Sequence, residues 1–145
     1  MTCAAFFDKS GSFPGTRIAL IKTVRVSFPH NPTQLSSTHS GSPFQAHYVA
    51  AKSAVNGLTK TLALEYGPHG ITANVVPPGF IDTPMLRKAE REGLLGGSIQ
   101  DNISKVPVGR VGMPEDIAAT CAFLVSEEAG YITGQIVGVN GGRCT

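Results

Sequence analysis

The sequence predicts an α/β fold built on a parallel sheet, and three observations favour it. Residues 48–66 carry apolar side chains at helical spacing. The segment GITANVVPPG at residues 70–79 is a short apolar, β-branched run of the kind that forms a buried strand. Two further helix patterns and a last apolar run follow, and the order helix, strand, helix, helix, strand is typical of a parallel α/β sheet.

The N-terminal segment is less regular than the rest of the chain. It holds one plausible strand, TRIALIKTVRVSF at residues 16–28, which Lys22 and Arg25 interrupt and prolines bound on both sides. The remainder of this segment is rich in Ser, Thr, Pro and Asn, which favour turns. We therefore expect a single strand here and no long helix.

A helix is predicted over residues 48–66. Its apolar stripe is expected to consist of Ala51, Val55, Leu58 and Leu62. Gly67 followed by Pro68 is a standard signal for the end of a helix. At 100° per residue, Tyr48 and Lys52 lie about 40° apart and just beside the stripe, so both should border the core at the rim of a cleft.

The next two elements follow from their boundary residues. The strand within residues 70–79 ends at two prolines and a glycine. Thr83 then offers an N-cap and Pro84 a first helical position, which predicts a new helix. Its charged sequence runs into the flexible GLLGG, so we expect a mobile helical flap over residues 85–103.

The last two elements complete the predicted sheet. Pro114 begins a helix whose first turn holds Glu115 and Asp116, where carboxylates face the positive end of the helix dipole. The apolar face of this helix is expected to consist of Ile117, Cys121, Leu124 and Val125. The run GQIVGVNGG at residues 134–142 is predicted to be the final strand.

Composition narrows the functional classes. The chain has 145 residues, 41% hydrophobic and 15% charged, which is enough for one core and not for two full domains. A formal net charge of +2 with scattered Lys and Arg argues against a nucleic-acid partner. No apolar run approaches the roughly 18 residues of a membrane span, and no secretory signal pattern begins the chain. The 3 cysteines show no metal-like spacing, so we expect a reducing, cytoplasmic location.

Tyr48 and Lys52 form a candidate proton-transfer pair. A free phenol with a pKa near 10 is a poor acid or base at neutral pH, but an ammonium one helical turn away favours the phenolate and should lower that pKa. The pair would then exchange a proton with a substrate oxygen. The same spacing also arises by chance, and the alternative is two polar residues at the edge of a packed helix.

The residues around this pair resemble a known family. YVAAK, followed by SAVNGLTKTLALEYGPHGITANVVPPGFIDTPM, resembles the short-chain dehydrogenase/reductase family, especially its bacterial 3-oxoacyl-reductase-like members. The Tyr-x-x-x-Lys motif of the family matches Tyr48 and Lys52, its Asn ahead of Pro-Gly matches Asn74, and its Pro-Gly-x-x-x-Thr matches residues 78–83. PVGRVGMPEDIAATCAFLVSEEAGYITGQIVGVNGG is similar to the C-terminal signature, so the resemblance covers residues 40–145.

The resemblance implies a Rossmann-type fold, here a partial doubly wound parallel sheet that lacks most of the N-terminal nucleotide-binding half. The Gly-rich turn of the family, which binds the pyrophosphate, should lie more than about a hundred residues before Tyr48. GSFPG at residues 11–15 has two glycines but neither a preceding strand nor a following helix pattern. We therefore divide the chain into a divergent N-terminal segment, 1–35, and the C-terminal half of a family domain, 36–145.

The resemblance also implies an oxidoreductase that uses NAD or NADP to interconvert a ketone and a secondary alcohol. Tyr48 would give or take the hydroxyl proton, and Lys52 would hold the nicotinamide ribose and lower the pKa of the phenol. Pro78, Gly79 and Ile81 would form the loop against the nicotinamide, with the missing Cβ of Gly79 allowing close approach of the backbone. The cofactor supplies the hydride, and the protein supplies orientation and a proton path.

Two hydroxyl residues have competing interpretations. Thr83 would donate a hydrogen bond to the carboxamide or to a phosphate, or it would simply cap the helix that begins at Pro84. Family members carry a carbonyl-polarising serine about thirteen residues before the tyrosine, and counting back without gaps reaches Leu35. We assign the role to Ser36, against the alternative that Ser36 and Ser37 only cap or turn the chain.

Two functional hypotheses follow from the resemblance. The first is a reductase that acts on a small-molecule carbonyl or alcohol substrate. The second is a catalytically inactive, truncated family member that retains oligomerisation surfaces. A homo-oligomer is expected in either case, because the helices matching 48–66 and the last helix contact neighbouring subunits in related enzymes. Four apolar residues of the flap either line the substrate site or pack against the body, namely Met85, Leu86, Leu94 and Leu95.

Overall fold

The computed structural model describes residues 17–21 and 46–143. Its strands and α-helices, in chain order, are β1 (Arg17–Ile21), α2 (Ala46–Tyr66), β2 (Thr72–Val76), α3 (Pro84–Arg91), α4 (Ile99–Ile103) and α5 (Pro114–Leu124). Two short 3-10 helices, Gly67–His69 and Glu127–Ala129, follow α2 and α5. The predicted strand at residues 16–28 is observed as β1, and its remainder lies outside the described residues.

The sheet is centred on β2. β1 pairs with β2 in parallel, in a register that runs from Arg17 opposite Thr72 to Ile21 opposite Val76. On the other edge of β2, the chain returns at residues 135–139, where Val137 N donates to Val75 O at 2.8 Å. This last segment forms isolated parallel bridges and no continuous strand, so the predicted final strand is only partly realised.

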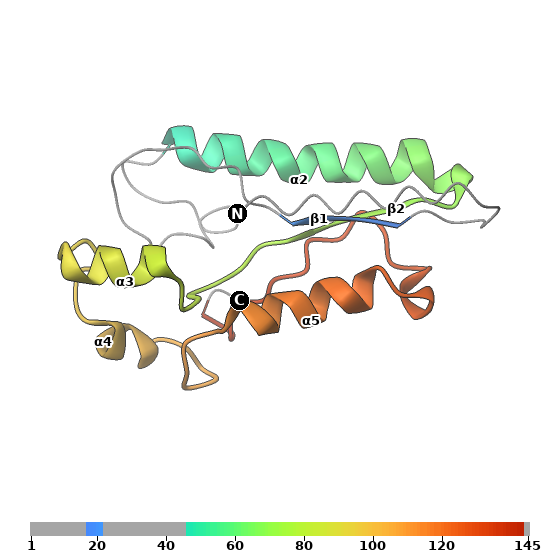
Figure 1. Ribbon diagram of the computed structural model, residues 1–145. Coiled ribbons are helices and arrows are strands. Elements are labelled where there is room, and N and C mark those ends of the chain that lie inside the picture. The colour runs from blue at the N-terminus through green and yellow to red at the C-terminus, as the bar shows by residue number, and fades with distance from the viewer. Residues whose placement is uncertain (1–16, 22–45, 144–145) are drawn as a thin grey trace.

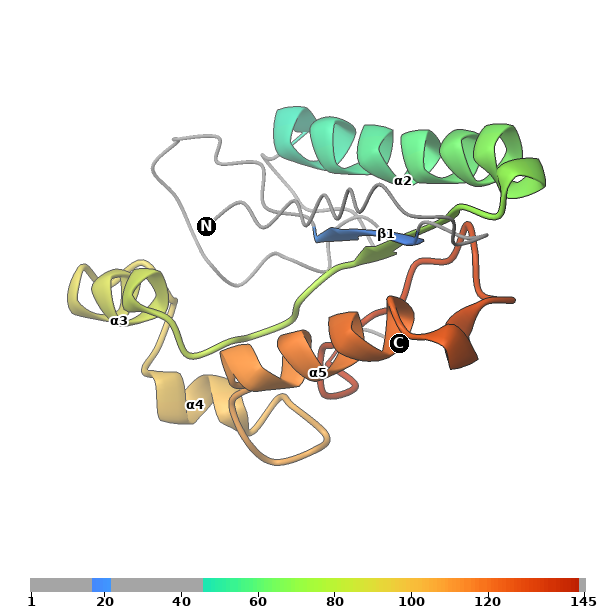
Figure 2. The same ribbon diagram turned by 45° about the vertical axis from the view of Figure 1, so that its right-hand side comes forward.

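Helices cover both sides of the strands. Figures 1 and 2 show α2 along one side of the β1–β2 pair and α5 along the other, with α3 and α4 beyond the carboxyl end of β2. All five residues of β2 are buried, as expected for a strand with helices on both faces. The predicted α/β class is confirmed, and the larger doubly wound sheet stays a prediction.

The buried face of α2 differs from the predicted one. The buried residues of the helix are Lys52, Thr59 and Ala63, whereas Leu58 is 53% exposed. The predicted stripe is therefore wrong at Ala51 and Leu58, which are exposed, whereas Val55 and Leu62 are half-buried. Small side chains explain the shift, because a Cβ added to Gly134 would lie only 3.4 Å from the Ala63 Cβ. Close approach of this kind excludes leucine from the contact.

The helix boundaries follow the predicted signals closely. α3 begins at Pro84, and the Thr83 hydroxyl accepts a hydrogen bond from Leu86 N at 3.2 Å. α5 begins at Pro114, but Val125 is 45% exposed and does not belong to its buried face, which corrects the prediction. α2 ends at Tyr66, as predicted from Gly67 and Pro68, and a 3-10 turn capped by Gly70 with a φ of 75° follows.

The flap, which contains α3 and α4, packs around a small hydrophobic core. Its buried side chains are Phe80, Leu86, Ala89, Leu95 and Ile99. Leu86 and Leu95 are 4% and 3% exposed, which favours the interpretation that they pack internally, whereas Met85 is 70% exposed. A second cluster, formed by Val76, Cys121 and Leu124, joins β2 to α5. The flap is therefore a packed unit attached to the end of β2.

Two negative observations apply to the residues that the structure describes. None of their helices combines the length and the apolar character needed to cross a membrane. Within the same residues, no group of three or more His, Cys, Asp or Glu side chains is arranged to hold a metal ion.

Candidate functional site

Tyr48 and Lys52 lie at the end of the molecule where the loop that follows β2 begins. α2 runs antiparallel to β2 and starts at the end where α3 lies (Figures 1 and 2). The first turn of α2, with Tyr48, is therefore on the same side of the fold as residues 77–83. Ligands of open α/β sheets bind outside the carboxyl ends of the strands, which is this side.

The side chains of Tyr48 and Lys52 are in contact. The Lys52 Nζ atom lies 5.5 Å from the centroid of the Tyr48 ring, within the range of a cation–π interaction. Lys52 is only 6% exposed, although lysine is almost never fully buried without a partner. The two predicted residues thus share one side of α2 and meet there.

The electrostatics of this pair correct one expectation. Burial raises the pKa of Tyr48 above its ordinary value, and burial lowers the pKa of Lys52. The predicted lowering of the phenol pKa is wrong in this structure, because desolvation by burial opposes the charged phenolate. Tyr48 therefore holds its proton at neutral pH, which suits a proton donor better than a base.

The loop after β2 is fixed by two neighbouring segments. Gly79 N donates to Val139 O at 2.8 Å, and Asp82 N donates to Gly112 O at 2.8 Å. A Cβ at Gly79 would lie 2.5 Å from the Asn140 Cα. The glycine is thus required by the returning chain, a reason the sequence did not reveal. Pro78 and Ile81 form parallel bridges with Val139 and Gly112.

Asn74 has a structural role in this region. The residue is 1% exposed. Its Nδ2 donates to Ile132 O at 2.8 Å, and its Oδ1 accepts from Gln135 N at 3.0 Å. Both ends of the amide are therefore used to fasten the returning chain to β2.

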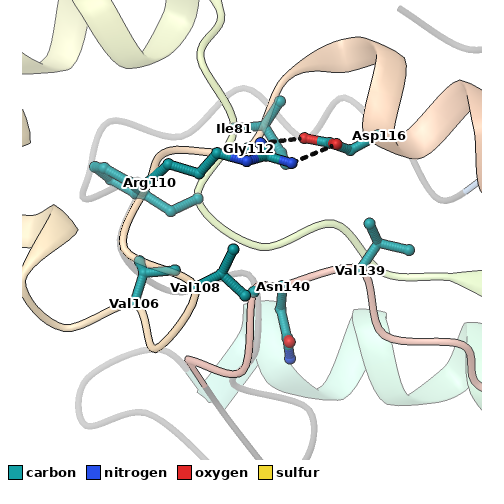
Figure 3. Close-up of a pocket in the computed structure, with 10 residues that line it drawn as sticks. Ile81, Val106, Val108, Arg110, Gly112, Asp116, Val139 and Asn140 are labelled. Atoms are coloured by element: carbon teal, nitrogen blue, oxygen red, sulfur yellow. Dashed lines mark hydrogen bonds and ion pairs between the residues drawn. The ribbon is translucent and has the colours of Figure 1, made fainter.

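A pocket of about 220 Å³ lies beside this loop. It is lined by Phe80, Ile81, Val106, Val108, Arg110, Gly112, Asp116, Val139, Asn140 and Gly141 (Figure 3). Among the predicted site residues that the structure describes, only Ile81 lines it. On one side, Arg110 Nη1 and Nη2 each lie 2.7 Å from an oxygen of Asp116. Asp116 also accepts from Met113 N at 2.7 Å.

The Arg110–Asp116 ion pair should make the folded protein less stable as the pH falls into the acid range. The Arg110 guanidinium, with help from the Met113 amide, holds the pKa of Asp116 well below its usual range. A carboxylate with a lowered pKa contributes stability that is present above about pH 3.9 and is lost as the pH falls further. We therefore expect Asp116→Asn to lose less thermal stability than wild type between about pH 6 and about pH 3.

Thermal melts at a series of pH values measure this difference. Glu115→Gln is the matched control, because it removes one exposed carboxylate from the same helical turn. The control should lose as much stability in acid as wild type. An equal loss in wild type and Asp116→Asn would contradict the assignment.

The remaining predicted residues are placed as follows. Thr83 caps α3 through its oxygen, and a hydroxyl that accepts still has its own hydrogen to donate. Ser36 lies outside the described residues, so its role stays a prediction, as does the boundary between residues 35 and 36. The contacts of Phe80, Asn140 and Arg143 were missed, because no sequence spacing joins segments so far apart.

Comparisons with known proteins agree with the resemblance. The family described as Enoyl-(Acyl carrier protein) reductase matches residues 32–143. The short-chain reductase protein NovJ of Streptomyces niveus is 49% identical over 105 residues, which cover 71% of this chain and 40% of NovJ.

Two further relatives are named 3-oxoacyl-[acyl-carrier-protein] reductase FabG. The protein of Rickettsia felis is 46% identical over 106 residues, covering 71% of this chain and 41% of the relative. That of Thermotoga maritima is 42% identical over 102 residues, covering 70% of this chain and 39% of the relative. The chain thus spans about two fifths of the length of these relatives. It belongs to the short-chain dehydrogenase/reductase family and matches its 3-oxoacyl-reductase-like members.

Proposed function

We propose that this chain carries the proton-transfer part of an NAD(P)-dependent reductase that converts a ketone to a secondary alcohol. The contact between the buried Lys52 ammonium and the Tyr48 ring, at 5.5 Å, is the observation that carries the proposal. It lies at the end of the fold where ligands of α/β sheets bind. Because two relatives are named 3-oxoacyl reductases, a 3-oxoacyl thioester is the first substrate to test.

The described residues fit the nicotinamide end of such a cofactor. A buried ammonium suits the hydroxyls of a ribose, since it is a charged hydrogen-bond donor. Thr83 keeps a hydrogen for a carboxamide or a phosphate, and Pro78 and Ile81 offer an apolar wall. The Cβ space of Gly79 is filled by Asn140, so that glycine fixes the loop and does not itself make room for the ring.

The chain's own residues would act as follows. When bound, the cofactor supplies a hydride to the carbonyl carbon. Tyr48, whose pKa is raised by burial, donates its hydroxyl proton to the carbonyl oxygen as negative charge develops there. Lys52 then stabilises the phenolate that remains, because an ammonium beside the ring favours the charged form.

Cofactor titration tests the proposal. Saturable binding of NADH or NADPH, followed by cofactor fluorescence, is expected for the wild-type chain. Lys52→Met should weaken it by about tenfold or more, the loss expected when a charge-assisted hydrogen bond is removed. Lys60→Met is the matched control, since Lys60 is an exposed lysine of the same helix. Absence of saturation at millimolar cofactor would overturn the proposal.

A second function is favoured by a different observation. Large apolar side chains are exposed on α2 and after α5, with Leu64 at 80% and Tyr131 at 102% of full exposure. Exposed apolar surface of this kind marks contact sites between proteins. A homo-oligomer that lacks catalytic activity is therefore the alternative, and the titration above separates it from the reductase. The cytoplasmic location stays a prediction.

A further inference from the structure

The C-terminal turn, residues 140–143, restricts the backbone that carries Arg143. Gly141 and Gly142 have φ angles of 63° and 81°, which few other residues adopt. Gly142 N donates to the Asn140 side-chain oxygen at 2.9 Å. A Cβ at Gly141 would lie 2.6 Å from a Val106 methyl carbon, so the turn presses directly on the neighbouring segment. The direction in which Arg143 leaves the turn is therefore fixed.

The Arg143 guanidinium contacts two other parts of the fold. Its Nη2 donates to the Asn102 Oδ1 atom at 3.0 Å. Its Cζ atom lies 5.0 Å from the centroid of the Phe80 ring, within the range of a cation–π contact. Asn102 belongs to α4 of the flap, and Phe80 belongs to the loop after β2. One side chain thus joins the flap, the loop and the C-terminal turn.

Asn102 uses both ends of its amide in this junction. The residue is 1% exposed, so each of its polar atoms needs a partner. Its Nδ2 donates to Ser98 O at 3.0 Å and thereby closes the turn before α4. Its Oδ1 is left to accept from Arg143. Loss of Arg143 would strand this buried acceptor and loosen α4.

Phe80 connects the same contact to the loop that follows Gly79. It is 5% exposed and packs in the core of the flap with Leu86 and Ile99. Gly112 N donates to Phe80 O at 2.9 Å, which fixes the backbone at this point. Because Phe80 belongs to the loop and packs in the flap core, the guanidinium over its ring links the C-terminal turn to both.

We propose that Arg143 is a positioning residue that holds the flap, residues 85–103, against the loop formed by Pro78, Gly79, Phe80 and Ile81. Any effect of the flap position on substrate binding rests on the proposed function. The contacts of Arg143 with Asn102 and Phe80 do not depend on it. In this arrangement the flap stays closed over the end of the sheet while Arg143 is in place. Without it, α3 and α4 open as a unit.

Hydrogen exchange of the full chain, without cofactor, tests the proposal. In Arg143→Met, amides of residues 85–103 are expected to exchange about tenfold faster or more, the factor for one lost hydrogen bond to a charged group. Amides of β2 and α5 should be unchanged. Arg143→Lys keeps a donor for Asn102 and should restore part of the protection. Arg91→Met, at an exposed arginine of α3, is the matched control and should behave as wild type.

Each other outcome counts against the proposal. Unchanged exchange in the flap would show that Arg143 does not hold it. Faster exchange throughout α2, β2 and α5 would mean that Arg143 serves overall stability and has no specific effect on the flap. If Arg143→Lys restores no protection, the hydrogen bond to Asn102 is not what holds the flap. Because no cofactor is present, failure here leaves the cofactor titration as a separate test of the reductase function.

Discussion

Tyr48→Phe is expected to lower the turnover number of ketone reduction by about 10²–10⁴-fold, the contribution typical of a positioned general acid. The variant keeps the aromatic ring that faces Lys52 Nζ at 5.5 Å and loses only the hydroxyl. Cofactor binding should therefore change little, and the loss should fall on kcat. Oxidation of NADPH with a 3-oxoacyl thioester as substrate provides the measurement.

A matched variant separates the chemistry from any effect on folding. Tyr66→Phe removes the hydroxyl of a tyrosine at the other end of α2, where the side chain is 44% exposed. It should retain full activity. Equal activity of wild type and Tyr48→Phe would rule out Tyr48 as the proton donor and leave only the family relationship.

The second large effect is expected at Gly79. An added Cβ would lie 2.5 Å from the Asn140 Cα, a distance that such atoms essentially never show, and the neighbour is backbone that cannot rotate away. Gly79→Ala should therefore lower the free energy of unfolding by about 1–3 kcal/mol, the usual cost of overpacking a well-packed site. Urea unfolding followed by circular dichroism measures the change.

Gly57→Ala is the matched control for this substitution. Gly57 lies inside α2, and nothing approaches within 4 Å of the position that a Cβ would take. Alanine is the better helix former, so this variant should gain about 0.5–1 kcal/mol. The opposite signs of the two substitutions are the result to look for. A Gly79→Ala variant as stable as wild type would show that the returning chain can move aside.

Much of the fold followed from local signals. Pro84 and Pro114 begin α3 and α5 as predicted, because proline fits the first helical turn, where its missing N–H costs nothing. The fully buried β2 was indicated by its short, mostly apolar run with β-branched residues. Such features depend only on neighbours within a few residues, so the sequence carries them directly.

The buried face of α2 could not be predicted in the same way. Hydrophobic periodicity selected a stripe with Leu58, yet the face against the strands holds Lys52, Thr59 and Ala63. The choice depends on how closely the partner segment approaches, and Gly134 lies far away in the sequence. Tertiary contact of this kind overrides periodicity, since space decides which side chain fits.

For the candidate site, the sequence predicted which residues meet better than it predicted their pKa shifts. Tyr48 and Lys52 meet as expected from their spacing. The direction of the Tyr48 pKa shift was not foreseen, because desolvation depends on the atoms that surround the phenol in space. The contact of Arg143 with Asn102 is also invisible in the sequence, where 41 positions separate the two residues.

The inward packing of the apolar side chains of α3 and α4 has a consequence for how such a protein diversifies. Leu86, Leu95 and Ile99 pack with Phe80 in one small interior, so the outward-facing side chains of this segment contribute little to folding. Met85, 70% exposed, can be exchanged for larger or smaller side chains with little penalty. Substitutions at Met85 can thus accumulate while the scaffold beneath it remains intact.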